Sequence, residues 1–252
     1  MAAATPIILV TAAGSSRRFA EAGVQIPKWA LEIGGRSMLE RAIDSVDPLL
    51  RGGAALHIVV QDAHRHHIES ALTDHLDAVI HTVSRMVAPG QAIDAAEALR
   101  SIDQSSPLVI WNADTIIDGV PSALPNGPWM VVSEQPGSQF SFARLSGDRI
   151  TATAEKVRIS PFATAGLYGF SSVSQFMETV RAEQEARAAA LDPAGAPAVE
   201  VYVAPLYNHL IASGVAVHGF RIPTASMESV GTPEELRSAC ARHGWTVPGA
   251  LV

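Results

Sequence analysis

Short apolar runs alternate with stretches of helical spacing through the first half of the chain, and this pattern predicts alternating strands and helices. Four runs have the length and the polar boundaries of buried strands: residues 6–11, 56–61, 78–82 and 108–111. Helices are predicted over 38–46 behind a Ser37-x-x-Glu40 capping box, after Asp62, and over 91–100. This alternation is typical of a mostly parallel central sheet with helices on both faces, so the predicted fold class is α/β.

The order of predicted elements differs in the second half of the chain, where several strands follow one another without helices between them. These strands cover residues 129–134, 139–144, 150–156 and 166–170. We therefore predict antiparallel additions to the same sheet. The remaining predicted elements are helices at 172–190 and 202–213, a Pro/Gly/Ala-rich flexible loop at 191–198, a strand at 215–221, and a helix from the Thr232 cap to His243. We find no internal repeat and no domain boundary, so residues 1–252 are predicted to form a single domain.

The composition excludes several classes of protein. The chain has 252 residues and is 48% apolar, which is too hydrophobic for a disordered chain. Its one cysteine, Cys240, excludes a disulfide-stapled secreted domain. No apolar run approaches the roughly 20 residues that span a bilayer, and residues 1–6 lack the regions of a signal peptide. We therefore expect a cytoplasmic protein without a membrane partner.

The charge argues against one class of partner and draws attention to two residues. A net charge of −7 and a pI near 5.7 argue against nucleic-acid binding, which calls for a basic patch. Of the 18 basic residues, only Lys28 and Lys156 are lysines. Either a compositional drift toward arginine has left these two unchanged, or their sites require a compact ammonium rather than a planar guanidinium.

The segment after the first predicted strand has the residues of a phosphate-binding loop. It is Thr11-Ala-Ala-Gly-Ser-Ser-Arg-Arg-Phe19, followed by Pro27-Lys28. Small residues let backbone N–H groups approach a phosphate closely, and the basic side chains can neutralise it. An exposed polar loop with a basic tip is the alternative that these residues leave open. The segment has neither a P-loop nor a three-glycine dinucleotide fingerprint, which argues against an NAD-dependent oxidoreductase.

Four segments, in the same order along the chain, resemble the motifs of the sugar-phosphate nucleotidyltransferases (NDP-sugar pyrophosphorylase-like proteins). That family has a glycine-rich loop ending in arginine and then Pro-Lys, a metal-binding aspartate at a strand end, a Glu-Lys pair before Gly-[IL]-Tyr-x-Phe, and a late Asp-x-Gly-Thr turn. The matching segments here are Ala12-Ala13-Gly14 with Arg18-Phe19 and Pro27-Lys28; Asn112-Ala-Asp114; Glu155-Lys156 with Gly166-Leu-Tyr168-Gly-Phe170; and Val230-Gly-Thr-Pro-Glu234. Each segment is modest alone, but the order makes the set specific.

The resemblance implies a Rossmann-like, GT-A-like fold and a transfer reaction that depends on Mg²⁺. An NMP group would pass from a nucleoside triphosphate to a sugar 1-phosphate or a related small phosphate or phosphonate, with release of pyrophosphate. Residues 1–128 would form the nucleotide-binding half and residues 129–252 the acceptor-binding half. Such a reaction needs no general base, because the nucleophile is already an ionised phosphate oxygen, and it requires positioning, cations and a metal. A homo-oligomer is compatible with this assignment.

The same resemblance assigns roles to individual residues. Arg18 and Lys28 would hold the triphosphate and the transition state, and Asp114 would bind Mg²⁺. Glu155 and Lys156 would contact the acceptor together with Gly166. The nucleotide-binding residues would be Ala12, Ala13, Gly14, Ser15, Ser16, Arg17 and Gln91, of which Gln91 reads the base or grips the nucleotide.

The chain departs from the family pattern at two positions. Ser16 stands where the family usually has a second glycine, which restricts how the backbone wraps a phosphate. Ser229 stands where the family has the aspartate that completes the metal site. Glu228 is adjacent and has a longer side chain, so we predict Asp114 and Glu228 as the metal ligands. Mg²⁺ needs only one or two carboxylates, so Asp114 without Glu228 is the alternative.

Two other functions stay open at this stage. A glycosyltransferase of the related nucleotide-sugar-binding fold would share the sheet and a metal-binding aspartate at a strand end, but the opening motif is typical of enzymes that bind a triphosphate. A non-catalytic relative that binds a nucleotide is the third reading, and the departures at Ser16 and Ser229 are its main support.

Overall fold

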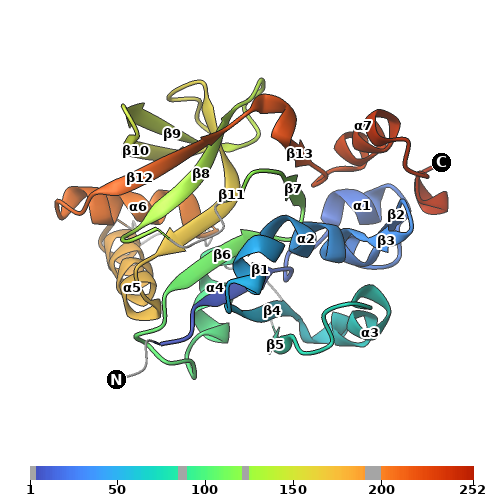
Figure 1. Ribbon diagram of the computed structural model, residues 1–252, viewed down its shortest axis with the longest axis horizontal. Helices are drawn as coiled ribbons and strands as arrows, with labels where there is room; N and C mark the ends of the chain where they lie inside the picture. Colours follow the sequence, from blue (N-terminus) through green and yellow to red (C-terminus); the bar gives the residue numbers. More distant parts are fainter. Residues whose placement is uncertain (1–3, 85–89, 121–124, 191–199) are drawn as a thin grey trace.

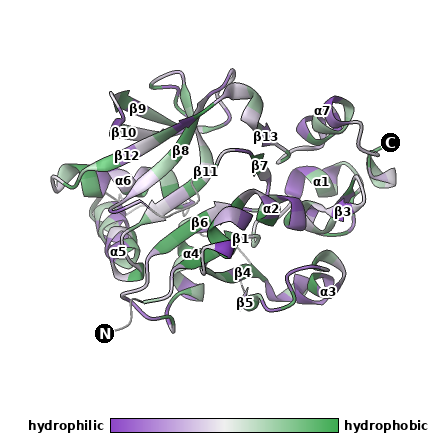
Figure 2. Ribbon diagram, in the orientation of Figure 1, coloured by the Kyte–Doolittle hydropathy of each residue, from purple (hydrophilic) through white to green (hydrophobic). Residues whose placement is uncertain are grey.

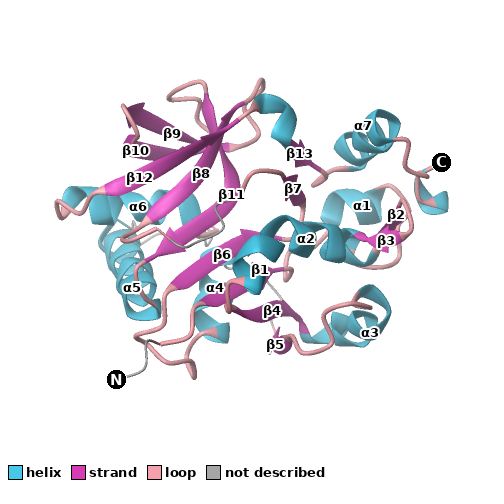
Figure 3. Ribbon diagram, in the orientation of Figure 1, coloured by secondary structure: helices cyan, strands magenta, loops and turns pink. Residues whose placement is uncertain are grey.

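The computed structural model describes residues 4–84, 90–120, 125–190 and 200–252, and its strands form one large sheet with helices packed around it (Figures 1 and 3). Within the described residues the sheet has nine strands in the order β5-β4-β1-β6-β11-β8-β12-β10-β9. The strands in chain order are β1 (Ile7–Thr11), β4 (Ala55–Gln61), β5 (Val79–Val83), β6 (Leu108–Asn112), β8 (Trp129–Glu134), β9 (Ser141–Ser146), β10 (Arg149–Glu155), β11 (Phe162–Phe170) and β12 (Val217–Ile222). The loop predicted at 191–198 lies outside the described residues.

The direction of the strands confirms the prediction in the first half of the chain and corrects it in the second. Strands β5, β4, β1 and β6 are parallel neighbours. Strand β11 runs antiparallel to β6, β8 and β9, and β10 runs antiparallel to β9 and β12, as predicted for the additions. The pairing of β9 with β11 closes these last five strands on themselves, so the sheet as a whole is mixed rather than mostly parallel. The reason is that short connections such as the one between β9 and β10 can only reverse the strand direction.

Helices cover both faces of the parallel strands. The side chains of β1 alternate, with Ile8 and Val10 packed toward α2 (Met38–Arg51) and Leu9 packed toward α4 (Gln91–Ala98). These side chains are fully buried, and each such burial contributes about 1.5–3 kcal/mol to folding. Figure 2 shows the hydrophobic residues concentrated along β4 and β6, which lie between the helices. Because both faces of β1 and β6 are covered, these two strands are nearly continuous apolar runs, which is why the sequence pattern finds them.

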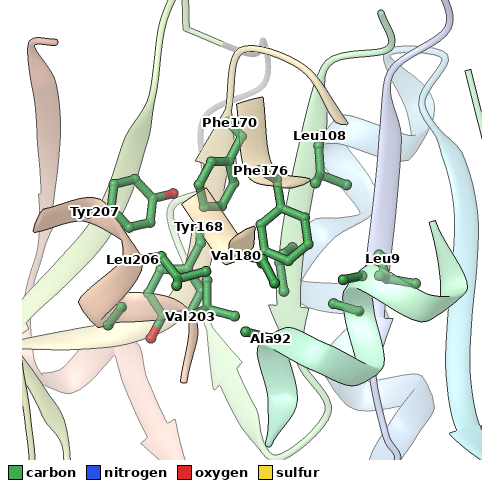
Figure 4. Packing of buried hydrophobic residues seen from close by; sticks show 14 of the residues in the cluster. Leu9, Ala92, Leu108, Tyr168, Phe170, Phe176, Val180, Val203, Leu206 and Tyr207 are labelled. Atoms are coloured by element: carbon green, nitrogen blue, oxygen red, sulfur yellow. The ribbon is translucent and has the colours of Figure 1, made fainter. Parts of the chain in front are cut away.

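The side of the sheet that carries α4 also carries α5 (Val173–Ala190) and α6 (Val203–Ala212). Together these helices enclose a core cluster that includes several aromatic residues. Figure 4 shows Tyr207 of α6 beside Phe170 of β11, with Phe176 of α5 nearby. The buried Tyr207 hydroxyl donates to the backbone carbonyls of Trp129 (3.0 Å) and Gly169 (2.8 Å). These hydrogen bonds tie α6 to β8 and β11.

The helix near the C-terminus packs against α1 (Arg17–Glu21), the helix that follows the loop after β1. Helix α7 (Pro233–His243) begins with Thr232, whose hydroxyl accepts the Glu235 N–H, and ends at Gly244 in the left-handed conformation, as predicted. This helix lies beside α1 (Figure 1), and Leu236 of α7 and Phe19 of α1 share a buried cluster. The short strands here are β2 (Glu32–Ile33), β3 (Arg36–Ser37), β7 (Thr115–Ile117) and β13 (Met227–Ser229), with β2 paired to β3 and β7 to β13.

The helix predictions hold with small differences. Helix α2 starts after its Ser37 cap as predicted but continues through Pro48 to Arg51. The stretch after Asp62 is a 3₁₀ helix, η2 (Asp62–His67), followed by the single turn α3 (Ile68–Ala71). Further 3₁₀ turns are η1 (Lys28–Ala30), η3 (Thr224–Ser226) and η4 (Gly249–Leu251). None of the described helices is both long enough and apolar enough to cross a membrane.

Candidate functional site

A cleft of about 790 Å³ opens at the carboxyl ends of β1 and β6 and extends along β10 and β11. Ligands of open α/β sheets bind at this edge, where loops and polar side chains converge. Residues from both halves of the chain line the cleft. Of the 14 residues that the sequence analysis singled out, 13 are among them: Ala12, Ala13, Gly14, Ser15, Ser16, Arg17, Arg18, Lys28, Gln91, Asp114, Glu155, Lys156 and Gly166.

The loop after β1 forms one wall of the cleft. Ala12 and Ala13 are buried, whereas a Cβ atom on Gly14 would meet nothing within 4 Å, so a ligand can approach the backbone there. Ser16 has φ 51° and ψ 23°, the left-handed conformation that glycine adopts most readily. This is the position at which the sequence departs from the family glycine, so the structure retains the glycine-like turn despite the serine.

Lys28 and Asp114 meet in the cleft. The Lys28 Nζ atom lies 2.5 Å from Asp114 Oδ2 and donates a hydrogen bond to it. Burial opposes ionisation of the Asp114 carboxyl, but the charge and hydrogen bond of Lys28 more than offset this, so the pKa of Asp114 lies below its ordinary value. The Val230 N–H donates to the Asp114 carbonyl at 3.0 Å, which joins the strand end of β6 to the turn before α7.

The two arginines of the loop lie at the rim of the cleft. Arg17 is exposed and pairs with Glu21 one helical turn later, at 3.8 Å. Arg18 is also exposed and borders the cleft. Long flexible guanidinium groups at this edge can fold over an anion that enters, at the cost of ordering their side chains.

A network of amide and hydroxyl groups lies at the ends of β1 and β6. Gln91 Nε2 donates to Thr11 Oγ1 at 2.7 Å and to Asn112 Oδ1 at 2.5 Å. Gly90, with φ 106°, begins α4 directly against the backbone of Val201, so no side chain fits there. On the other side of Asn112, a Cβ atom on Gly166 would lie 2.6 Å from Asn112 Nδ2. The Gln91 side chain therefore has a defined position at the head of its helix.

The far end of the cleft carries the Glu155–Lys156 pair. The Glu155 carboxylate accepts from the Ser141 hydroxyl and lies 3.6 Å from Lys156 Nζ. Lys156 Nζ donates to the Tyr202 hydroxyl at 2.9 Å. This hydrogen bond, with the charges of Glu155 and Glu200, raises the pKa of Lys156 above its ordinary value. Lys156 is therefore a cation held by a hydrogen bond at this end of the cleft.

Glu228 is the predicted site residue that the structure does not place in the cleft. Its carboxylate binds the Arg242 guanidinium, with Nη2 to Oε2 at 2.7 Å, and lies 3.8 Å from His243. The neighbouring Ser229 lines the cleft, and consecutive residues of β13 point to opposite sides, so Glu228 faces α7. Among the described residues, no three His, Cys, Asp or Glu side chains form a group that could hold a metal ion by themselves.

Several lining residues have roles that the sequence analysis did not assign. Asn112 stands in the same strand-end motif as Asp114, and that position is a usable signal for a site residue. Ser141, Glu200 and Glu235 also line the cleft. They lie on separate elements of the second half and share no motif, so only the fold brings them together.

The comparisons with known proteins agree with the resemblance seen in the sequence. Residues 8–122 match the profile of the family described as MobA-like NTP transferase domain. This confirms the resemblance to nucleotidyltransferases over the segment that contains the loop after β1, Lys28 and Asp114. No curated protein matches the sequence significantly.

Solved structures of similar fold carry related names. A nucleoside-diphosphate-sugar pyrophosphorylase from Vibrio cholerae RC9 superimposes with a TM-score of 0.75 at 24% identity, over 92% of this chain and 98% of that one. A putative glucose-1-phosphate thymidylyltransferase from Bacillus anthracis gives 0.73 at 16% identity, over 94% and 95%. The inositol-1-phosphate CTP transferase from T. maritima gives 0.69 at 13% identity, over 95% and 94%. At these identities the likeness shows that the chain has the nucleotidyltransferase fold.

Proposed function

We propose that this protein is a Mg²⁺-dependent nucleotidyltransferase, which transfers NMP from a nucleoside triphosphate to a small phosphorylated acceptor and releases pyrophosphate. The acceptor would be a sugar 1-phosphate or a related phosphate or phosphonate. The observation that carries the proposal is the Lys28–Asp114 pair, which lies in one cleft with the loop after β1 and with Glu155 and Lys156.

The nucleotide would bind in the half of the cleft formed by residues 1–128. The backbone of the loop from Ala12 to Arg17 surrounds the triphosphate, and Gly14 leaves room for close approach. Arg18 and Lys28 supply the cations that a triphosphate needs. Gln91 holds the nucleoside, because its amide lies at the strand ends and is fixed by Thr11 and Asn112.

The acceptor would bind in the half formed by residues 129–252. Lys156 is placed to contact its phosphate, and Glu155 to accept hydrogen bonds from its hydroxyl or amine groups. Gly166 lines the cleft and lies directly against Asn112, so any side chain there would meet the Asn112 amide.

The reaction would be an in-line displacement at the α-phosphorus. An ionised oxygen of the acceptor phosphate forms a bond to that phosphorus, while the bond to the bridging oxygen of pyrophosphate breaks. No proton has to be removed from the nucleophile. Lys28 and Arg18 stabilise the charge that develops on the transferring and leaving groups, and Lys156 offsets the repulsion between two polyanions.

The residues present fit a magnesium ion held with the substrate. Asp114 offers a carboxylate that lies at the strand end, inside the cleft, and is ionised at neutral pH. Mg²⁺ is usually bound by one or two carboxylates plus substrate phosphates and waters, so Asp114 suffices without Glu228. When bound, the ion neutralises triphosphate charge and orients the α-phosphate.

A pyrophosphate-release assay over a matrix of substrates tests the proposal. All common NTPs would be combined with sugar 1-phosphates, phosphocholine and aminoalkylphosphonates, with and without Mg²⁺. We expect turnover for at least one combination and none without the metal. Release of free nucleoside diphosphate from a nucleotide-sugar would instead indicate a glycosyltransferase. Nucleotide binding without any turnover, from folded protein, would indicate a non-catalytic relative.

A further inference from the structure

Ser16 has a backbone conformation that few residues other than glycine adopt. Its φ of 51° and ψ of 23° lie in the left-handed region. Among the non-glycine residues that the structure describes, only Ser16 and Lys156 have a positive φ. The Ser16 carbonyl accepts the N–H groups of Phe19 and Ala20, which begin α1. A glycine would make this turn without strain, so the presence of serine calls for a contribution from its side chain.

The side chain of Ser16 makes such a contribution to a residue of the site. Its Oγ atom accepts the backbone N–H of Lys28 at 3.1 Å, across 12 positions of the chain. Lys28 is the first residue of η1, and its ammonium is the group that meets Asp114. The hydroxyl thus holds the backbone of the lysine from the loop that would surround the triphosphate.

We infer that Ser16 is a positioning residue. Its hydroxyl, rather than the left-handed turn of its backbone, holds Lys28 where the lysine can contact the phosphates of a nucleotide. The inference rests on the proposed function for the identity of the ligand, but the link to Lys28 is a property of the free protein. Substitutions can separate the left-handed turn at Ser16 from the hydrogen bond between the Ser16 hydroxyl and the Lys28 N–H. Ser16→Gly keeps the turn and removes the hydroxyl, whereas Ser16→Ala removes the hydroxyl and keeps the backbone strain.

Amide hydrogen exchange at Lys28 tests the link without reference to activity. In the free wild-type protein the Lys28 N–H is hydrogen-bonded, and we expect about tenfold faster exchange in both Ser16 variants, the scale of one lost neutral hydrogen bond. Ser172→Ala is the matched control, because Ser172 Oγ also accepts a backbone N–H at 3.1 Å, from Gln175 on α5 and away from the cleft. Exchange at Lys28 should not change in this control. Wild-type exchange at Lys28 in Ser16→Gly would overturn the inference.

Steady-state kinetics then separates positioning from structure. We expect kcat/KM for the NTP to fall about tenfold in Ser16→Gly and Ser16→Ala alike, while KM for the acceptor stays the same. A purely structural role of the left-handed turn predicts that Ser16→Gly is at least as active as wild type, and this result would contradict the inference. Absence of turnover in the wild-type protein contradicts the proposed function, whereas the exchange measurement still decides the role of Ser16.

Discussion

The Lys28 ammonium lies 2.5 Å from the Asp114 carboxylate, although 86 positions of the chain separate the two residues. One follows the loop after β1 and the other follows β6, and these strands are parallel neighbours in the sheet. A triphosphate and a metal would each take one partner of this pair, Lys28 for the phosphates and Asp114 for the ion. In the free protein the two side chains therefore neutralise one another in the place where the substrate charges would lie.

Lys28→Ala and Asp114→Asn should each lower turnover by about 10²- to 10³-fold, the scale of losing a preorganised charge at a phosphoryl transfer site. Stability should change by about 1–3 kcal/mol, because the pair is partly buried, with 19% of the Lys28 side chain and 30% of the Asp114 side chain exposed. Pyrophosphate release and thermal melting measure the two effects. A variant that retains wild-type turnover would remove its residue from the site.

Glu228→Gln should leave turnover and its Mg²⁺ dependence within about twofold of wild type. The Glu228 carboxylate faces Arg242 of α7 and not the cleft, so loss of its charge should not affect a metal ion at Asp114. The measurement is a Mg²⁺ titration of initial rates, with Asp114→Asn beside it. An increase in the Mg²⁺ requirement of Glu228→Gln that matches that of Asp114→Asn would place Glu228 at the metal after all.

Gly166→Ala should destabilise the protein and reduce activity, because Gly166 has a φ of 81° and a methyl group would lie 2.6 Å from Asn112 Nδ2. Gly147→Ala is the matched control, since Gly147 has a φ of 63° but no atom within 4 Å of a Cβ there. The control measures backbone strain alone, about 1–2 kcal/mol. Denaturant unfolding should show a larger loss for Gly166→Ala, and equal losses would mean that the contact with Asn112 is unimportant.

The stability of the protein should fall as the pH drops below the ordinary histidine pKa of about 6.5. His57 and His81 lie on neighbouring strands with His57 Nδ1 and His81 Nε2 2.9 Å apart, and burial lowers the pKa of both; the charge of His81 adds to the effect on His57. The unfolded chain therefore takes up protons at a higher pH than the folded one, so acid favours unfolding. Melting temperatures from pH 7.5 to 5 measure the effect. The loss should be smaller in His57→Leu than in wild type, and an equal loss would assign it to other groups.

Local pattern predicts the parallel half of this fold because β1, β4 and β6 are mostly buried. The runs that become these three strands are short and mostly apolar, and stretches of helical spacing follow β1 and precede β6. The closure of the second half could not be predicted in this way. The pairing of Ala163 with Phe142 and the parallel register of β8 with β12 join segments that no local periodicity relates. Strand pairing of this kind is decided by packing of the whole sheet.

In the site, too, some residues could be predicted from short sequence motifs, whereas the position of others depends on the fold. The loop after β1, Lys28 and Asp114 belong to contiguous motifs at strand ends, and motifs of this kind can be read from sequence. The position of the Glu228 side chain could not be predicted from sequence, because a residue next to Ser229 in the chain need not face the same way. On a strand, one residue of shift turns a side chain to the opposite face, and it is Ser229 that faces the cleft.

A crystal structure of the protein with a non-hydrolysable NTP analogue and Mg²⁺ tests the central claim most directly. We predict that the triphosphate lies against the loop after β1 with Lys28 Nζ on a phosphate oxygen, and that the ion is bound to Asp114. The distance between Lys28 Nζ and Asp114 Oδ2 should then exceed the 2.5 Å of the free protein. A complex in which the nucleotide binds elsewhere, or in which Lys28 and Asp114 remain paired with no phosphate between them, would contradict the account.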